Sequence, residues 1–290
     1  MRLSFTVVER YCAAKSGDAS ENEDMIVATP DYVAVLDGTT DKSNASVGGM
    51  SPGRFAAVSV ATILETLEPR LSAREAIDAM TTGLRDDLLR VGYDPGVGEA
   101  AVVAVIYSAH RHEIWRVGDC TYTIDGVVRD LEEVLEHHAA AVRAAFIHAS
   151  LLKGASVSEL CDVDSGRAFI LPLLQLQPML RNVDTDLRYA YGAIDGRHVP
   201  DRFLEVESVP PYCREIVLAT DGYPEVMGTL EASEAHLAYM LSEDPLCINV
   251  HPQTKGKTRG LLSFDDRSYV RLAFYGRSAP GIRAADGGGR

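Results

Sequence analysis

The stretch DMIVATPDYVAVLDG, residues 24–38, decides the fold of this chain. Its two short apolar runs, 25–28 and 32–36, are rich in β-branched residues, which is typical of buried strands. An aspartate, Asp37, follows where the second run ends, and Gly38 lies beside it. The segment therefore predicts two neighbouring strands, the second of which ends in a carboxylate.

The same design recurs further along the chain. The run EIWRVGD leads to Asp119, and the run EIVLATDG leads to Asp221. Two more segments carry adjacent carboxylates: Glu23-Asp24 and Asp265-Asp266. Because an unpaired buried charge is costly, strands rarely end in carboxylates that have no partner. Several carboxylates that converge at one sheet edge indicate a hard divalent cation, and oxygen ligands suit Mg²⁺ or Mn²⁺.

The remaining elements come in blocks. Ser51 and Ser72 are expected N-caps of two amphipathic helices, which end before Pro69 and at Gly92. Further helix is expected at 231–242 and across 131–181, where Pro172 and Pro178 divide it into two or three pieces. Further strands are expected at 2–10, 100–107, 112–117, 121–124, 187–192, 203–208, 214–219 and 268–274.

This order predicts an α+β fold with largely antiparallel sheets, because strands and helices do not alternate as in βαβ units. We expect two packed sheets flanked by helix pairs. No linker divides the chain, so residues 1–276 are expected to form one domain with a helical insertion at about 130–185. The Gly-rich segment 277–290 is expected to be a disordered tail.

Composition narrows the class of protein. The 290 residues are 46% hydrophobic and 24% charged, as in globular proteins, and the formal net charge is −14. Such a surface repels nucleic acid and anionic membranes, so neither is an expected partner. The five cysteines are scattered without a CxxC pair, which argues against disulfides and zinc. The most apolar stretch, AAVVAVIY, is too short to span a bilayer, and we expect a soluble cytoplasmic protein.

Taken together, these motifs resemble those of the PP2C-type metal-dependent serine/threonine phosphatases. The matching segments are, in order, Asn22-Glu23-Asp24, Asp37-Gly38, Gly118-Asp119-Cys120, Thr220-Asp221-Gly222 and Asp265-Asp266. Order and rough spacing agree across residues 1–275, but the block 130–190 shows no match. The resemblance implies an α/β/β/α sandwich that hydrolyses phosphoserine and phosphothreonine in proteins.

The resemblance also implies roles for individual residues. Asp37 would bridge two cations, and the backbone carbonyl of Gly38 would bind one of them. The other expected ligands are Asp24, Asp221 and Asp265. Two Mn²⁺ or Mg²⁺ ions would activate a water for in-line attack on phosphorus, so no protein nucleophile is needed.

Three further acidic residues have implied roles. Asp119 matches the residue that holds a weaker third ion in bacterial members. Glu23 would act through water. Asp266 stands where the family has Asn, so Asp265 is the expected ligand of that pair.

Two positions depart from the family pattern. Ala19 stands where the family places an arginine that binds the substrate phosphate, and Lys15 and Arg54 are the candidate replacements. Thr39 stands where eukaryotic members often carry a histidine, and a threonine hydroxyl is a poor general acid.

These departures leave two other functions open. One is a phosphatase that acts on a small phosphorylated metabolite. The other is a metal-binding pseudophosphatase whose helical block recognises a partner. The sequence leaves open whether that block is a lid, a partner surface or packed core.

Overall fold

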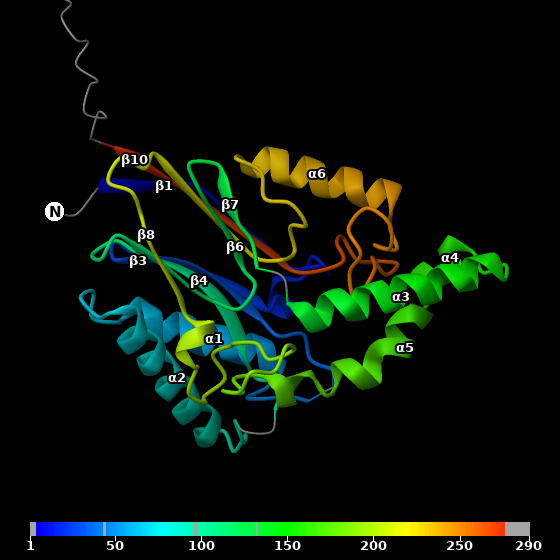
Figure 1. Ribbon diagram of the computed structural model, residues 1–290, viewed down its shortest axis with the longest axis horizontal. Helices are drawn as coiled ribbons and strands as arrows, with labels where there is room; N and C mark the ends of the chain where they lie inside the picture. Colours follow the sequence, from blue (N-terminus) through cyan, green and yellow to red (C-terminus); the bar gives the residue numbers. More distant parts are fainter. Residues whose placement is uncertain (1–3, 43–44, 96–97, 132, 276–290) are drawn as a thin grey trace, which may run out of the picture.

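The computed structural model describes residues 4–42, 45–95, 98–131 and 133–275, and the expected tail at 277–290 lies outside them. Two five-stranded sheets face each other (Figure 1). Sheet A has the order β1 (Ser4–Ala13), β10 (Arg267–Tyr275), β9 (Glu215–Ala219), β6 (Thr121–Ile124) and β7 (Val127–Arg129). Sheet B has the order β2 (Asp24–Ala28), β3 (Tyr32–Gly38), β4 (Val102–Ser108), β5 (Glu113–Val117) and β8 (Glu205–Ser208).

The described helices follow the predicted blocks. They are α1 (Pro52–Glu65), α2 (Ala73–Arg90), α3 (Val134–Leu152), α4 (Val157–Asp162), α5 (Ser165–Leu174) and α6 (Leu230–Glu243). Short 3-10 turns are η1 (Ala19–Glu21), η2 (Gln177–Leu180) and η3 (Asp201–Phe203). Both expected N-caps are confirmed, since Ser51 and Ser72 each accept a hydrogen bond from the backbone N–H three residues on.

The core forms three apolar layers around the sheets. Between the sheets, Val33 and Val35 of β3 lie in one cluster with Leu218 of β9 and Val270 of β10. The outer face of sheet B packs against α1 and α2. The outer face of sheet A packs against α6. Every strand pairing between neighbours is antiparallel, so the expected α+β sandwich is confirmed.

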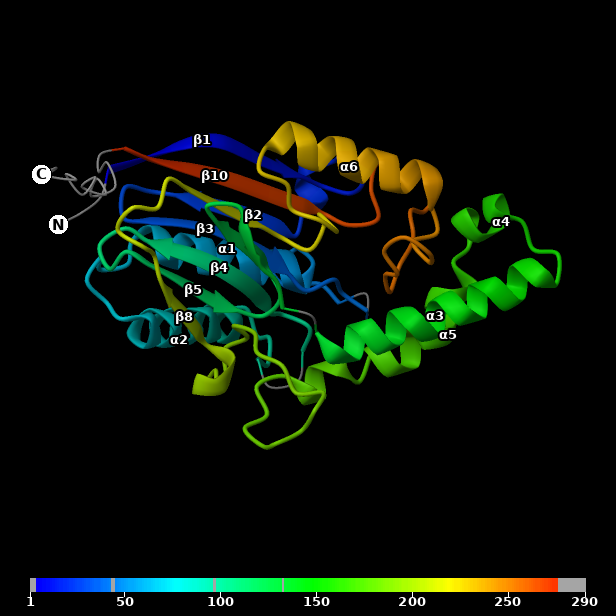
Figure 2. The same cartoon turned by 45° about the horizontal axis from the view of Figure 1, so that its top comes forward.

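The helices of the expected insertion do not cover a sheet face. α3 and α5 pack on each other and extend from one end of the sandwich (Figure 2). The buried Arg143 of α3 explains this position, because its guanidinium donates to the carbonyls of Leu246, Cys247 and Gln253. The helical block is thereby tied to the loop before β10 rather than to a sheet face.

Two local predictions are wrong. Residues 187–192 form no strand, because Tyr191 makes only an isolated bridge to Arg181. Pro172 does not interrupt its helix but lies inside α5. The helix ends at Leu174, so the missing N–H weakens only its last turn.

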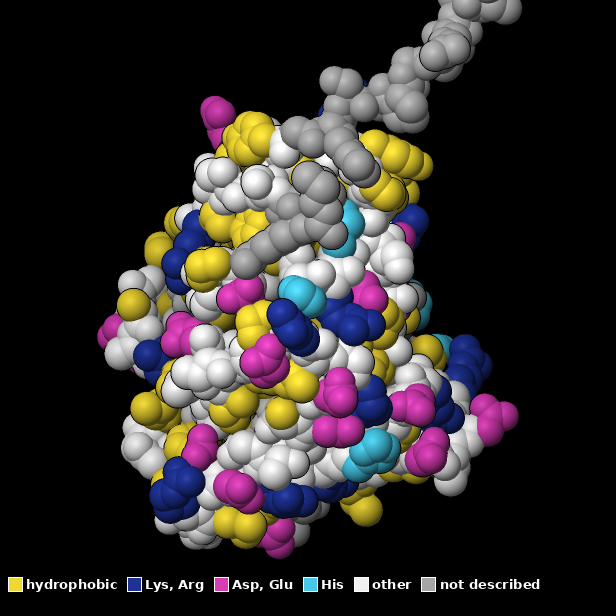
Figure 3. All heavy atoms as spheres, turned by 90° about the vertical axis from the view of Figure 1, so that its left-hand side faces the viewer, with side chains coloured by type: hydrophobic (Ala, Val, Ile, Leu, Met, Phe, Trp, Pro, Cys, Tyr) yellow, Lys and Arg dark blue, Asp and Glu magenta, His cyan; other side chains and the backbone are white. Residues whose placement is uncertain are grey.

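The face opposite α3 and α5 carries acidic and basic side chains interspersed (Figure 3). The excess of acidic residues in the sequence is therefore not concentrated on this face. No described helix has the length and hydropathy needed to cross a membrane.

Candidate active site

Strand register brings the first two aspartates together. Asp24 of β2 lies directly opposite Asp37 of β3. The Asp24 side chain is buried, and its Oδ2 accepts a hydrogen bond of 2.7 Å from Thr220 Oγ1, which follows β9 in the other sheet. Thr220 Oγ1 in turn accepts from the backbone N of Ser268 at 2.8 Å. The two sheets are thus joined at the end where the carboxylates gather.

Two more predicted residues reach the same end through loops. Asp221 follows β9, and Asp119 lies on the connection between β5 and β6. Because β6 pairs with β9, these two loops are neighbours. Besides burial, the charge of Asp221 is among the causes that raise the pKa of Asp37, so the two carboxylates are neighbours. We call Asp24, Asp37, Asp119 and Asp221 the acidic end.

Two glycines permit this convergence. A Cβ on Gly38 would lie 2.5 Å from the carbonyl oxygen of Gly53 at the start of α1. A Cβ on Gly222 would lie 1.9 Å from the carbonyl oxygen of Asp266. Since no real side chain tolerates such contacts, the glycine after each aspartate is required by close backbone packing.

The acidic end is short of positive charge. Burial raises the pKa of Asp24 and of Asp37 well above the usual range, and neighbouring carboxylates raise it further. Burial also raises the pKa of Asp119, to which the charge of Asp221 adds. Burial and the charge of Asp265 raise the pKa of Asp221 to about 6. A cation among these groups would favour their ionised forms.

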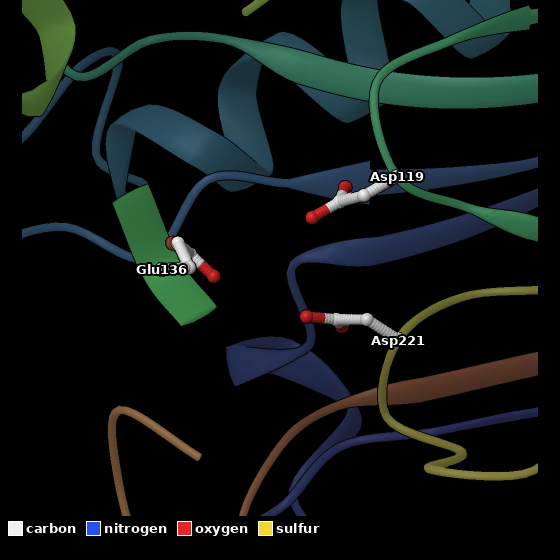
Figure 4. A group of neighbouring side chains, drawn as sticks. All are labelled: Asp119, Glu136 and Asp221. Carbon is white, nitrogen blue, oxygen red and sulfur yellow. The ribbon is translucent and has the colours of Figure 1, made fainter. Parts of the chain in front are cut away.

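The residues present fit a divalent metal. Asp24 Oδ1 is buried and has no hydrogen-bond partner within the described chain, which is costly unless a cation binds it. Among the described residues, the carboxylates whose oxygens lie within 4.8 Å of one another are Asp119, Glu136 and Asp221, and this group could hold an ion. Asp24 and Asp37 do not belong to it. Figure 4 shows Glu136 reaching toward Asp119 and Asp221 from α3.

Asp265 has a different environment. Its Oδ2 lies 2.5 Å from Lys255 Nζ, and its Oδ1 lies 3.4 Å from Lys15 Nζ. Burial works to raise the pKa of Asp265, but the two ammonium groups outweigh it and hold that pKa below its ordinary value. Of the predicted ligands, Asp265 is therefore already neutralised by protein cations.

Asp266 and Glu23, the other members of the two acidic pairs, form hydrogen bonds that join separate segments of the chain. Asp266 accepts from the backbone N of Lys15 and of Glu23, both at 2.8 Å. Glu23 Oε1 accepts from Ser51 Oγ at 2.6 Å, at the start of α1. These contacts hold the two ends of the described chain against the acidic end.

The two candidate phosphate-binding residues have other partners. Arg54 donates to the backbone carbonyls of Ala19 and Asn22. Besides Asp265, Lys15 Nζ lies 3.5 Å from Glu23 and 3.5 Å from Asp266. Both cations are thus engaged within the protein.

The acidic end opens onto a small cavity of about 70 Å³. Asp37, Asp119, Asp221 and Asp265 are among its lining residues, whereas Asp24 is not. Several lining residues carry no sequence motif: Thr40, Lys42, Glu133, Glu136, Arg167, Gln177, Tyr191, Gln253, Thr254 and Lys255. Most of these come from the helical block and from the loop before β10, and neither segment contains a pattern that points to chemistry. The block is therefore part of the cavity wall.

A second cavity adjoins the first. Its volume is about 490 Å³, and it shares Asp119, Glu133 and Tyr191 with the smaller one. Its other lining residues are mainly apolar, among them Leu131, Val134, Phe203 and Leu204.

No family model and no curated protein matches the chain. Solved structures similar to it include the serine/threonine phosphatase PstP/Ppp of Mycobacterium tuberculosis, at 14% identity over 94% of this chain and 99% of that chain, with a TM-score of 0.45. Another is the serine/threonine phosphatase Stp1 from Staphylococcus aureus, at 15% identity over 95% of this chain and 98% of that chain, with a TM-score of 0.47.

A third is the catalytic domain of PstP in complex with two manganese ions, at 13% identity over 94% of this chain and 98% of that chain, with a TM-score of 0.47. Likenesses at these TM-scores do not establish an activity, so the function of the site rests on its own residues.

Proposed function

We propose that this chain is a metal-dependent phosphomonoester hydrolase that acts on phosphoserine and phosphothreonine in proteins. The observation that carries the proposal is the acidic end itself. Asp37, Asp119 and Asp221 line a cavity, and Asp24, which lies opposite Asp37, has a buried oxygen without a hydrogen-bond partner within the described chain. The cavity is also lined by lysine and arginine side chains, which suits an anionic substrate. The motif resemblance of the sequence points to the same activity.

Asp24, Asp37 and Asp221 are the proposed ligands of the ions needed for turnover, together with the Gly38 carbonyl. The Asp119–Glu136–Asp221 group is the proposed place of a further ion. Mn²⁺ or Mg²⁺ bound there would supply an acidified water and offset charge on the phosphoryl oxygens.

The protein's own groups fix the orientation of these ligands. Thr220 Oγ1 donates to Asp24 Oδ2 and holds that carboxylate in place. The other oxygen of Asp24, Oδ1, has no hydrogen-bond partner within the described chain and is left for a cation. Thr39 Oγ1 donates to the Ala101 carbonyl at 2.8 Å, so this hydroxyl is engaged in the fold. Proton delivery to the leaving group is therefore not assigned to Thr39.

The test is hydrolysis of an aryl phosphate and of a phosphothreonine peptide with added Mn²⁺ or Mg²⁺. We expect metal-dependent turnover that a chelator abolishes. Asp37→Asn should lower kcat by about 1,000-fold, because a proposed ligand of the ions loses its charge. The matched control is Asp86→Asn, which removes an exposed carboxylate from α2.

No turnover with either ion, in protein that binds Mn²⁺ by calorimetry, would reject the hydrolase and favour a pseudophosphatase. Turnover of the aryl phosphate without turnover of the phosphopeptide would move the substrate to small phosphorylated molecules.

A further inference from the structure

Three cations from three distant segments line the same cavity as Asp37, Asp119 and Asp221. Lys42 follows β3, Arg167 belongs to α5, and Lys255 lies in the loop before β10. We call these three residues the basic wall. None of them carries a sequence motif, and only the folded chain brings them together.

Among the described residues, two members of the basic wall have no carboxylate within hydrogen-bonding distance: Lys42, whose side chain is buried, and Arg167, which is half-buried. The Lys42 side chain is 5% exposed, and its carboxylate partner, Glu99, lies 3.9 Å away, beyond hydrogen-bonding distance. The Arg167 guanidinium donates to a backbone carbonyl, that of Thr254, at 3.1 Å. Burial lowers the pKa of Lys42 and of Arg167, and the neighbouring acidic groups do not offset it.

Buried arginines elsewhere in the chain are paired differently. Arg143 lies 2.7 Å from Asp164, and Arg181 lies 2.8 Å from Asp195. A buried charge normally needs such a partner. Compared with these two residues, Arg167 and Lys42 have unused capacity to bind an anion.

Lys255 places a third positive charge next to the acidic end. Its Nζ contacts Asp265 at 2.5 Å and donates to Thr40 Oγ1 at 3.1 Å. The loop that carries it is held by Arg143, and Asp164 accepts from the backbone N of Gly256 at 3.3 Å. The ammonium group is therefore held in place by contacts on both sides.

We propose that Lys42, Arg167 and Lys255 bind the phosphoryl group of the substrate, in place of an arginine near the N-terminus. A phosphate dianion next to the basic wall would pair with its uncompensated positive charges, and cations held by the acidic end would offset the repulsion from the carboxylates. Arg167 can donate two parallel hydrogen bonds, whereas each lysine supplies a point charge. Lys15 and Arg54 do not line this cavity. The inference rests on the proposed function and names its phosphate-binding residues.

The test compares three variants, Lys42→Met, Arg167→Met and Lys255→Met, with controls that remove exposed charges, Arg90→Met and Lys153→Met. Inorganic phosphate is the probe, titrated by calorimetry with Mn²⁺ present, and KM and kcat are measured with an aryl phosphate. Arg167→Met should weaken phosphate binding and raise KM by about 10- to 100-fold, the effect of one lost charge-assisted hydrogen bond.

Mn²⁺ affinity, measured without phosphate, should change by less than about threefold in Arg167→Met, because this residue binds no metal. Arg167→Lys should restore part of the phosphate affinity. Unchanged phosphate affinity in all three variants would overturn the inference. So would a loss that merely follows lower thermal stability in the same variants.

The experiments distinguish a failure of the phosphate subsite from a failure of the proposed hydrolase activity. If the wild type binds phosphate through these residues but hydrolyses nothing, the subsite stands and the hydrolase fails. If the wild type hydrolyses aryl phosphate and the three variants match it, the hydrolase stands and the subsite fails.

Discussion

The two sides of the cavity are built in different ways. On the acidic end, backbone pairing sets the positions, since Asp24 lies opposite Asp37 across two strands. On the other side, α3, α5 and the loop before β10 are held by side-chain contacts, above all those of Arg143. Groups on strands are positioned more accurately than groups on loops. The comparison indicates that Asp24 and Asp37 are positioned by the sandwich, whereas the cavity residues Glu136, Arg167 and Lys255 depend on the helical block and on the loop that it holds.

The largest effect is expected from a substitution on the side of the cavity that the sandwich forms. Gly222→Ala places a Cβ 1.9 Å from the Asp266 carbonyl oxygen. The backbone next to Asp221 must then shift, and we expect a loss of about 4 kcal/mol in the free energy of unfolding. Gly228→Ala is the control, because nothing lies within 4 Å of a Cβ there.

Urea unfolding of the two glycine variants measures this difference. The control should remain within about 0.5 kcal/mol of the wild type. Equal stability of both variants would mean that the close packing of Gly222 is not required.

The next effect concerns the other side. Arg143→Met removes the cation that pairs with Asp164 and the donor to three backbone carbonyls. We expect a loss of about 3 kcal/mol, the lower end for a broken buried ion pair, because the Asp164 side chain remains partly exposed. Substrate KM should also rise, since the loop that carries Lys255 loses its anchor.

Arg259→Met is the matched control for Arg143→Met. Arg259 pairs with Asp162 near the same helices, but its side chain is 64% exposed. Its removal should cost less than about 1 kcal/mol. If both arginine variants unfold at the same urea concentration, the anchoring role of Arg143 is wrong.

The same contrast explains what the sequence could predict. Asp37 and Asp221 were found because a strand that ends in Asp-Gly is a local pattern. The two-sheet fold could be predicted for the same reason, since apolar alternation and turn residues are also local. Nothing around Arg143, in AAAVRAAF, indicates that this arginine is buried and anchors a loop more than a hundred positions away. In the same way, no local pattern indicates that Glu136 lines the site.

The wrong strand at 187–192 has a related cause. Its residues have an acceptable local pattern, but in the fold Tyr191 bridges only to Arg181 and no ladder forms. Tertiary context decides such cases against propensity.

A smaller effect links the acidic end to pH. Burial and the charge of Asp265 raise the pKa of Asp221 in the folded state from 3.8 to about 6. The folded protein then binds more protons than the unfolded chain, so stability falls as the pH rises from 3.8 to about 6. Excess Mn²⁺ should remove this fall, because a cation favours the ionised carboxylates.

Thermal unfolding of the metal-free protein across this window measures the fall. It is taken as the difference between the wild type and Asp221→Asn, because other carboxylates titrate in the same range. Asp86→Asn should retain the wild-type slope. If the stability of the metal-free wild type minus that of Asp221→Asn rose with pH, the assignment would be wrong.

The smallest expected effect tests whether the sandwich and the helical block both supply ligands to one metal ion. Glu136 of α3 belongs to the Asp119–Glu136–Asp221 group, whereas Glu133, three residues earlier, does not. Both carboxylates line the cavity and accept from Gln177 Nε2, at 2.9 and 2.8 Å. Glu136→Gln and Glu133→Gln therefore remove the same charge and disturb the same hydrogen-bond donor.

If the helical block supplies a ligand, Glu136→Gln should weaken the lowest-affinity Mn²⁺ site by about tenfold or more, and Glu133→Gln by clearly less. Calorimetric titration with Mn²⁺ resolves the two variants. Equal weakening would show that only the summed negative charge of α3 matters. The ion would then be held by Asp119 and Asp221 alone, and the sandwich would supply every metal ligand.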